Sequence, residues 1–330
     1  MSAALKPDAA QPLVRARDLS VLFQNRDRTV HAVNGVDLDL AQGEVLCLLG
    51  ESGSGKSVTL RALMKLLPKQ AKVCGSIEVA GRDVQAMSES QLSDFRGGEV
   101  AMIFQEPMTA LDPVFTIGRQ IAEAVQRHEG ASRSAADARA LELLELVQIP
   151  SAKRRLAAYP HELSGGLRQR AMIAVALACK PKLLLADEPT TALDATVQIQ
   201  VLLLLRELQE RLGMGVIFVT HDLGVAGEIA DRVAVMYAGR VVEEGEVGPF
   251  MGGPLHPYAQ GLLGATVHPG MRGKRLTTIP GAPPSLETAP TTCAFAPRCA
   301  LAEPACLDGV PAPRPAGPGR MTRCIKVGAP

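Results

Sequence analysis

The sequence contains no tryptophan, and aromatic residues make up only 3% of its 330 positions. Proteins that bind single-stranded nucleic acid stack bases on aromatic side chains, so such platforms are scarce here. The net charge of +1 provides no strongly basic surface either. We therefore expect no nucleic-acid partner.

The sequence also lacks any stretch near the roughly 18 uninterrupted apolar residues that a membrane-spanning helix requires. Its apolar runs, such as Val45–Leu49 and Val201–Leu205, have the length of a strand or of part of a core helix. The opening segment MSAALKPDAAQP does not show the charged-then-apolar pattern of a secretory signal. These features predict a chain that stays in the cytoplasm and reaches a membrane only through partners.

The hydrophobic pattern predicts an α/β fold. Apolar and polar residues alternate in two runs within residues 13–40, which indicates antiparallel strands joined by a turn at Gln24–Thr29. Four later runs are apolar throughout, as in parallel strands buried on both faces, and lie at 45–49, 183–186, 216–219 and 233–236. Helical spacing occupies the segments between them, at 60–67, 117–127, 134–148 and 196–212.

A change of composition follows residue 250 or so, after which proline, glycine and alanine dominate. Such a segment cannot bury a large core by itself. We expect it to pack on the main domain, to be held by a ligand or to be loose. The sequence thus divides into a domain at 1–254 and a C-terminal region at 255–330.

A phosphate-binding loop is predicted where GESGSGKS fits G-x-x-x-x-G-K-[ST], after a buried strand and before a helix. Glycines let the backbone turn its N–H groups around phosphates, and the helix N-terminus adds partial positive charge. Lys56 is expected to reach the β- and γ-phosphates and Ser57 to bind Mg²⁺. The other predicted loop residues are Gly50, Ser52, Gly53, Ser54 and Gly55.

Two carboxylates, Asp187 and Glu188, end the apolar run LLLA. A carboxylate at a strand end beside the phosphates can hold Mg²⁺, a role that we assign to Asp187. Glu188 is then placed to activate the attacking water as general base. We expect the whole ATP site to be built from residues before 222.

The segment LSGGLRQR, residues 163–170, resembles the signature of ABC ATPases. The resemblance implies a RecA-like core with an N-terminal antiparallel sheet and a helical insertion at about 107–165. It implies that Ser164, Gly165 and Gly166 serve the ATP of a second ATPase subunit across a head-to-tail dimer. That subunit is expected to be a different, paired chain.

Other positions match the same family, and their roles are carried over from it. Gln105 matches the Q-loop, which reaches Mg²⁺ or water, and His221 matches the switch histidine that contacts the γ-phosphate. Residues 192–194 match the D-loop at the dimer seam. Phe23 is the expected adenine-stacking residue, with His31 as the alternative.

Longer phrases such as FQEPMTALDPVFTIGRQI and LHPYAQGLL resemble the ATPases of dipeptide and oligopeptide importers. This resemblance implies peptide import driven by ATP hydrolysis at the cytoplasmic face of the inner membrane. Two membrane-spanning permeases and, indirectly, a solute-binding protein are the implied partners. A nickel or other small-solute importer remains an alternative, as does a soluble ABC ATPase without a transport role.

The seven cysteines fall into two groups. Three are isolated in apolar or strand-like contexts and are expected to be small core residues: Cys47, Cys74 and Cys179. The other four have the spacing C-x5-C-x6-C-x17-C and are Cys293, Cys299, Cys306 and Cys324. Four thiolates can bind Zn²⁺ or a [4Fe–4S] cluster, or can stay unliganded. The resemblance to peptide-importer ATPases favours the iron–sulfur cluster.

Overall fold

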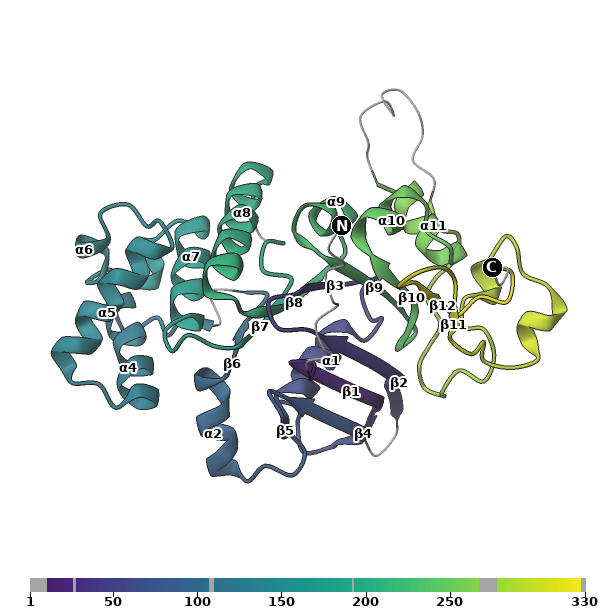
Figure 1. Cartoon of the computed structure of the whole chain (residues 1–330), viewed down its shortest axis with the longest axis horizontal. Helices are drawn as coiled ribbons and strands as arrows, with labels where there is room; N and C mark the ends of the chain where they lie inside the picture. Colours follow the sequence, from purple (N-terminus) through teal and green to yellow (C-terminus); the bar gives the residue numbers. More distant parts are fainter. Residues whose placement is uncertain (1–10, 26–27, 107–109, 192, 267–277, 328–330) are drawn as a thin grey trace, which may run out of the picture.

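The structure is a computed structural model that describes residues 11–25, 28–106, 110–191, 193–266 and 278–327. Its strands form two sheets, a four-stranded one in the order β2-β1-β4-β5 and an eight-stranded one in the order β11-β12-β10-β9-β3-β8-β7-β6. Helices cover the larger sheet (Figure 1). No helix within the described part of the chain is long and apolar enough to cross a membrane.

The smaller sheet confirms the two predicted antiparallel strands. Its first strand, β1, pairs antiparallel with both β2 and β4. Buried and more exposed residues alternate along β1, so one face of this sheet packs on the core. Residues 26–27 of the predicted turn lie outside the described residues. The strands are β1 (Val14–Gln24), β2 (Thr29–Leu40), β4 (Ala71–Val79) and β5 (Arg82–Asp83).

The larger sheet has the predicted parallel centre, because β3 pairs parallel with β8 and β9, and β7 with β6 and β8. Every residue of β3, β7 and β8 is buried. This explains why their sequences are apolar without alternation. The strands are β3 (Val45–Leu49), β6 (Val100–Ile103), β7 (Leu183–Asp187), β8 (Gly215–Thr220), β9 (Arg232–Tyr237) and β10 (Arg240–Glu246).

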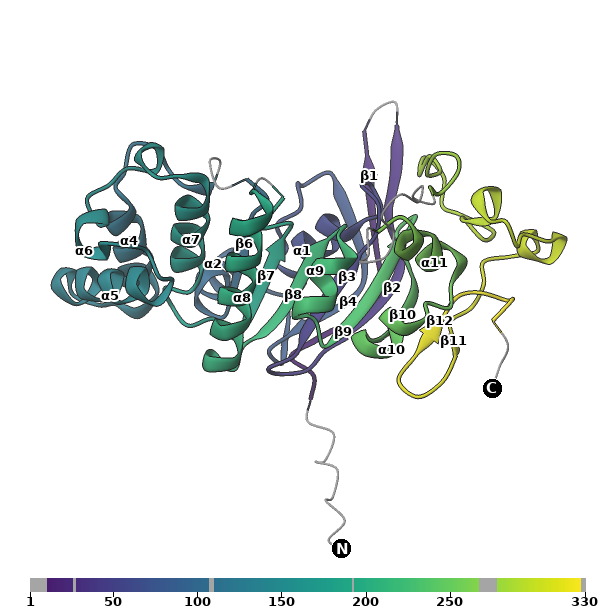
Figure 2. The same cartoon turned by 90° about the horizontal axis from the view of Figure 1, so that it is seen from above.

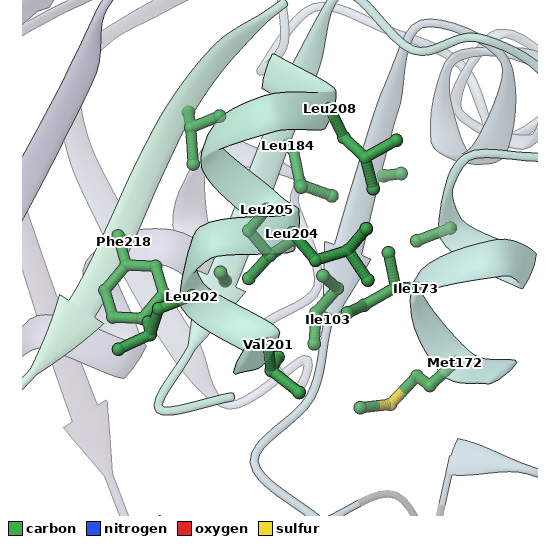
Figure 3. Close-up of a cluster of buried hydrophobic side chains, with 14 of the residues drawn as sticks. Ile103, Met172, Ile173, Leu184, Val201, Leu202, Leu204, Leu205, Leu208 and Phe218 are labelled. Carbon is green, nitrogen blue, oxygen red and sulfur yellow. The ribbon is translucent and has the colours of Figure 1, made fainter. Parts of the chain in front are cut away.

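Strand β3 separates two hydrophobic clusters. Cys47 and Leu49 pack with the helices α8 (Ala195–Leu212) and α9 (Leu223–Ile229) on one face. Leu46 and Leu48 pack with the smaller sheet and α1 (Lys56–Leu63) on the other. Figure 3 shows α8 leucines between Phe218 of β8, Ile103 of β6 and Ile173.

Helix α1 ends earlier than the sequence predicts. The leucine spacing continues to Leu67, but the helix stops at Leu63. The amides of Lys65 and Leu66 donate to the carbonyls of Ala62 and Arg61. Lys65 takes a left-handed φ of 52°. This closure satisfies the last carbonyls before Pro68 is reached.

The helical part of the molecule lies at one end and the C-terminal region at the other, in both views (Figures 1 and 2). The first residues of the predicted insertion, 107–109, lie outside the described residues. The helices at this end are α4 (Ile117–Glu129), α5 (Arg133–Leu146), α6 (Ala152–Arg155) and α7 (Gly165–Ala176), with η1 (Pro160–Glu162) before α7. Helix α2 (Glu89–Gly98) precedes β6.

The C-terminal region packs on the core through the larger sheet. Strand β12 (Met321–Thr322) pairs with β10, and β11 (Arg314–Pro315) pairs with β12. Glu243 of β10 is fully buried and forms an ion pair with Arg320 at 2.8 Å. Of the three predicted alternatives, packing on the main domain is therefore the one observed. The other elements are α10 (Val247–Gly252), α11 (Pro257–Gly264), η2 (Ala296–Arg298) and η3 (Pro304–Leu307).

Candidate active site

The predicted phosphate loop connects β3 to α1, and the path of its backbone requires its first and last glycines, Gly50 and Gly55. Gly50 has φ 148° and Gly55 has φ 104°, values that disfavour other residues. A Cβ on Gly50 would lie 2.2 Å from the Met236 carbonyl oxygen, and one on Gly55 2.5 Å from that of Ala32. Neighbouring backbone therefore holds this loop in a tight turn at the N-terminus of α1.

The ammonium of Lys56 is buried inside the loop. Its Nζ donates to the carbonyl oxygens of Gly50 at 2.7 Å and Glu51 at 2.9 Å. Burial lowers the pKa of Lys56, while the nearby carboxylates of Glu188 and Asp187 oppose that shift. A positive charge is thus held at the loop by carbonyls, beside the two acids that the sequence singled out.

Ser57 and Asp187 meet as the sequence predicts. The Ser57 hydroxyl donates to Asp187 Oδ1 at 2.7 Å. Asp187 ends β7 and is 2% exposed, so burial raises its pKa, and the Ser57 hydrogen bond opposes this. A hydroxyl and a carboxylate oxygen are the hard ligands that Mg²⁺ prefers, so these two residues fit the ion.

Glu188 is the point at which the predicted catalytic residues converge. Its Oε2 accepts hydrogen bonds from Thr191 Oγ1 at 3.0 Å and Gln105 Nε2 at 3.4 Å, and it lies 3.4 Å from His221 Nδ1. Glu188 also has a left-handed φ of 46°, held by its amide, which donates to the Val219 carbonyl at 3.1 Å. Strained backbone of this kind is concentrated at functional sites.

Most of these groups line a cavity of about 760 Å³, a volume within the usual size range of ligand pockets, but Gly50 and Asp187 are not among its lining residues. Phe23, Gln105, Glu188 and His221 all line it, whereas His31 is not among its lining residues. The loop contributes Glu51, Ser52, Gly53, Ser54, Gly55, Lys56, Ser57 and Val58, and the remaining lining residues are Val30, Ala32 and Leu286.

The signature residues do not line this cavity. Ser164 is the N-cap residue of α7, and its side chain makes no capping hydrogen bond. A Cβ on Gly166 would lie 2.6 Å from a methyl group of Val197 in α8, so the two helices approach closely at this glycine. In the predicted D-loop, Ala192 lies outside the described residues, and Asp194 caps α8.

The expectation that the site ends before residue 222 is wrong. Leu286 lines the cavity, and its carbonyl accepts a hydrogen bond from the His31 amide at 2.7 Å. Tyr258 and Arg298 both bond to Glu51 of the phosphate loop. No motif spacing marks these residues, because they reach the site through packing of the C-terminal region.

The four clustered cysteines line one small cavity of about 20 Å³. Burial raises the pKa values of the Cys293 and Cys299 thiols. Within the described ranges, however, no three histidine, cysteine or acidic side chains are arranged to hold a metal ion. This geometry does not support the predicted iron–sulfur cluster. The prediction that Cys74 is a core residue is wrong, since Cys74 is exposed on β4, where the pairing of β4 with β1 shifts register.

Comparison with known proteins decides the family. Residues 33–191 match the ABC transporter family, and residues 242–306 match the oligopeptide/dipeptide transporter C-terminal region. The oligopeptide transport ATP-binding protein OppD of Salmonella typhimurium is 45% identical over 320 residues, covering 97% of this chain and 95% of OppD. The chain belongs to the ABC transporter ATPases of the oligopeptide-importer type.

Two further relatives of this ABC ATPase agree in sequence and in fold. OppD of Bacillus subtilis is 49% identical over 293 residues, which cover 88% of this chain and 82% of that protein. The dimeric ATP-binding cassette MJ0796, solved with ADP and Pi, has a TM-score of 0.64 and 30% identity, covering 71% of this chain and 98% of that one. The predicted ABC-type fold is thereby confirmed.

Proposed function

We propose that this ABC ATPase powers the import of peptides by hydrolysing ATP at the cavity described above. The observation that carries the proposal is the convergence of Gln105 and His221 on the Glu188 carboxylate, in the same cavity as the phosphate loop. The C-terminal match and the names of the OppD relatives support peptides as the cargo. The domain division at residues 254 and 255 stays a prediction.

In this proposal the loop residues and Lys56 bind the phosphates of ATP, and Ser57, Asp187 and Gln105 hold Mg²⁺. When bound, Mg²⁺ neutralises charge on the phosphates. Glu188 accepts a proton from the attacking water. In the same proposal His221 contacts the γ-phosphate, and its support is that the side chain is exposed and lies 3.4 Å from Glu188.

The base of ATP has an apolar wall in this cavity. Phe23 provides the aromatic face for the adenine, and Val30 and Leu286 extend the same wall. Leu286 comes from the C-terminal region, so the two parts of the chain share the nucleotide. Phe23 lines the cavity and His31 does not, which favours Phe23 as the residue that stacks on the adenine.

The partners follow from the family and from the position of α7. Ser164, Gly165 and Gly166 lie outside the cavity of their own chain. This supports the proposal that they bind the ATP held by a second, paired ATPase subunit. A helix N-terminus suits that role because its free amides attract phosphate. Two permeases in the membrane, fed by a solute-binding protein, complete the proposed importer at the cytoplasmic face of the inner membrane.

The cargo is tested by uptake. Cells that express this chain with its neighbouring permease genes are expected to accumulate a labelled di- or oligopeptide, and an empty vector is the control. Labelled nickel is supplied in parallel. Nickel uptake without peptide uptake would contradict the peptide proposal in favour of the small-solute alternative.

The narrower proposal for the C-terminal region is a [4Fe–4S] cluster held by Cys293, Cys299, Cys306 and Cys324. Its support is that all four thiols line one cavity, and four cysteines are the usual ligand set. The observed arrangement would have to adjust to bind iron, since no metal-holding group is present in the described residues. The cluster would hold the region together and take no part in hydrolysis.

Anaerobic purification tests this. We expect a brown protein with iron and sulfide each near four per chain, as a cubane cluster requires. Cys306→Ser is expected to bleach it, whereas Cys179→Ser, outside the cavity, is the matched control and keeps the colour. If metal analysis finds stoichiometric zinc instead of iron, the cluster proposal is wrong and the four cysteines form a zinc site. If it finds no metal, the four thiols are unliganded.

A further inference from the structure

The C-terminal region holds one residue of the phosphate loop from two sides. Arg298 donates two hydrogen bonds to the Glu51 carboxylate, from Nη1 to Oε2 at 2.7 Å and from Nη2 to Oε1 at 3.0 Å. The Glu51 amide donates to the Tyr258 hydroxyl at 2.8 Å. Both the side chain and the backbone of Glu51 are therefore fixed by residues more than 200 positions later in the sequence.

The arginine that makes these contacts is itself held on every side. Its side chain is 5% exposed, its Nε donates to the Pro280 carbonyl at 2.8 Å, and its Nη1 also reaches Tyr237 Oη at 3.3 Å. The guanidinium lies 5.8 Å from the centre of the Tyr237 ring. An arginine side chain stays protonated in proteins, and the Glu51 hydrogen bonds raise the pKa of Arg298 further. Bidentate pairing of this kind fixes orientation as well as distance.

An aromatic cluster supports both contacts. The rings of Tyr237 and Tyr258 lie 4.5 Å apart, and that of Phe295 lies 5.3 Å from Tyr237 and 5.4 Å from Tyr258. Tyr237 ends the core strand β9, whereas Tyr258 and Phe295 belong to the C-terminal region. The cluster thus fixes the tail against the strand next to β3, from which the phosphate loop emerges.

Glu51 transmits this support to the lysine of the loop. Its carbonyl oxygen accepts a hydrogen bond from Lys56 Nζ at 2.9 Å. One chain of contacts therefore runs from Arg298 and Tyr258 through Glu51 to Lys56. The Arg298 cation also neutralises a carboxylate that lines the nucleotide cavity and would otherwise repel the phosphates.

We infer that Arg298 and Tyr258 are positioning residues for ATP, through which the C-terminal region sets the affinity of the phosphate loop for nucleotide. This inference rests on the proposed role of Lys56 at the phosphates. Neither residue lines the cavity, so each acts through Glu51. A purely structural role would instead affect the melting temperature and leave nucleotide affinity unchanged.

The test is the affinity of the purified full chain for MgATP, measured by isothermal titration calorimetry beside the melting temperature. Arg298→Gln is expected to weaken affinity about fivefold to tenfold, the size of coupling usual between residues in contact. In a protein that already carries Glu51→Gln, no carboxylate remains at this position to repel phosphate. There, Arg298→Gln is expected to weaken MgATP affinity less than about twofold. Arg298→Lys keeps the charge and is expected to restore part of the affinity.

Two more variants guard against misfolding. Tyr258→Phe removes a single hydroxyl and is expected to weaken MgATP affinity about twofold to fivefold, since one hydrogen bond is lost. Lys326→Gln is the matched control, because it removes a charge from the same region that pairs with Glu303 and not with the loop. Its affinity is expected to equal that of the parent. In the assembled transporter, Arg298→Gln is expected to raise KM for ATP and to preserve kcat.

The inference would be overturned if Arg298→Gln and Tyr258→Phe both folded and both bound MgATP with the affinity of the parent protein. An equal loss from Arg298→Gln with and without the Glu51 carboxylate would also overturn it. Lys56→Ala, titrated in parallel, separates this failure from that of the proposed function. If Lys56→Ala loses affinity and the two C-terminal variants do not, only the positioning role falls. If Lys56→Ala binds MgATP normally, the proposed phosphate site itself is wrong.

Discussion

Glu188→Gln is expected to lower ATP turnover about a hundredfold to ten-thousandfold, the usual contribution of a general base. The amide has nearly the same shape as the carboxylate but cannot accept the proton of the attacking water. Phosphate release by the assembled transporter measures the effect. Peptide uptake should fall with it, because transport is driven by hydrolysis.

The binding of ATP provides the control for this variant. The phosphate loop does not include Glu188, so MgATP affinity should stay near that of the parent. With the chemical step blocked, ATP should accumulate in a closed dimer of ATPase subunits, detectable by size-exclusion chromatography. Turnover at the parent rate would show that another group is the base, and loss of binding would show that Glu188 has a structural role.

Lys56→Ala is expected to weaken MgATP binding about tenfold to a hundredfold, because hydrogen bonds to charged groups contribute about 1.5–3 kcal/mol each. The substitution removes the only ammonium in the loop and leaves the carbonyls of Gly50 and Glu51 without their donor. Calorimetric titration of the purified chain measures it. Unchanged affinity would contradict the assignment of the phosphate site.

The matched control for Lys56→Ala is Ser164→Arg. Ser164 lies outside the cavity of its own chain, so this variant should bind MgATP with the affinity of the parent. In the assembled transporter, the added bulk at the start of α7 should stop hydrolysis at the opposite site. If both variants lost binding equally, the proposed service of the signature to a second subunit would be wrong.

The core could be predicted from the sequence because its signals are local. Parallel strands buried on both faces are apolar along nearly their whole length, and β3, β7 and β8 are, apart from Asp187 and Thr220 at the carboxyl ends of β7 and β8. The phosphate loop could be located because its turn needs glycine where a Cβ would strike the Met236 and Ala32 carbonyls. Burial of a strand on both faces and tight backbone turns each require particular residue types at fixed spacing, so both can be recognised in the sequence.

The remaining features depend on contacts that leave no such pattern in the sequence. Helix α1 ends at Leu63 through a left-handed Lys65, although the leucine spacing continues. Arg298 and Tyr258 complete the loop through packing of a region without periodicity. Cys74 follows a strand-like pattern, but it lies on a part of β4 that the core does not cover. Each of these outcomes was decided by tertiary structure.

The pairing of Glu51 with Arg298 has a consequence for the synthesis of the protein. The two residues are separated by 247 positions, so the ribosome makes the loop long before its partner. At about 5–20 residues per second, the delay is on the order of 10 to 50 seconds. During that interval the nascent chain carries a phosphate loop without the arginine that fixes it. A ribosome that stops before residue 298 therefore releases a subunit with an unfinished ATP site.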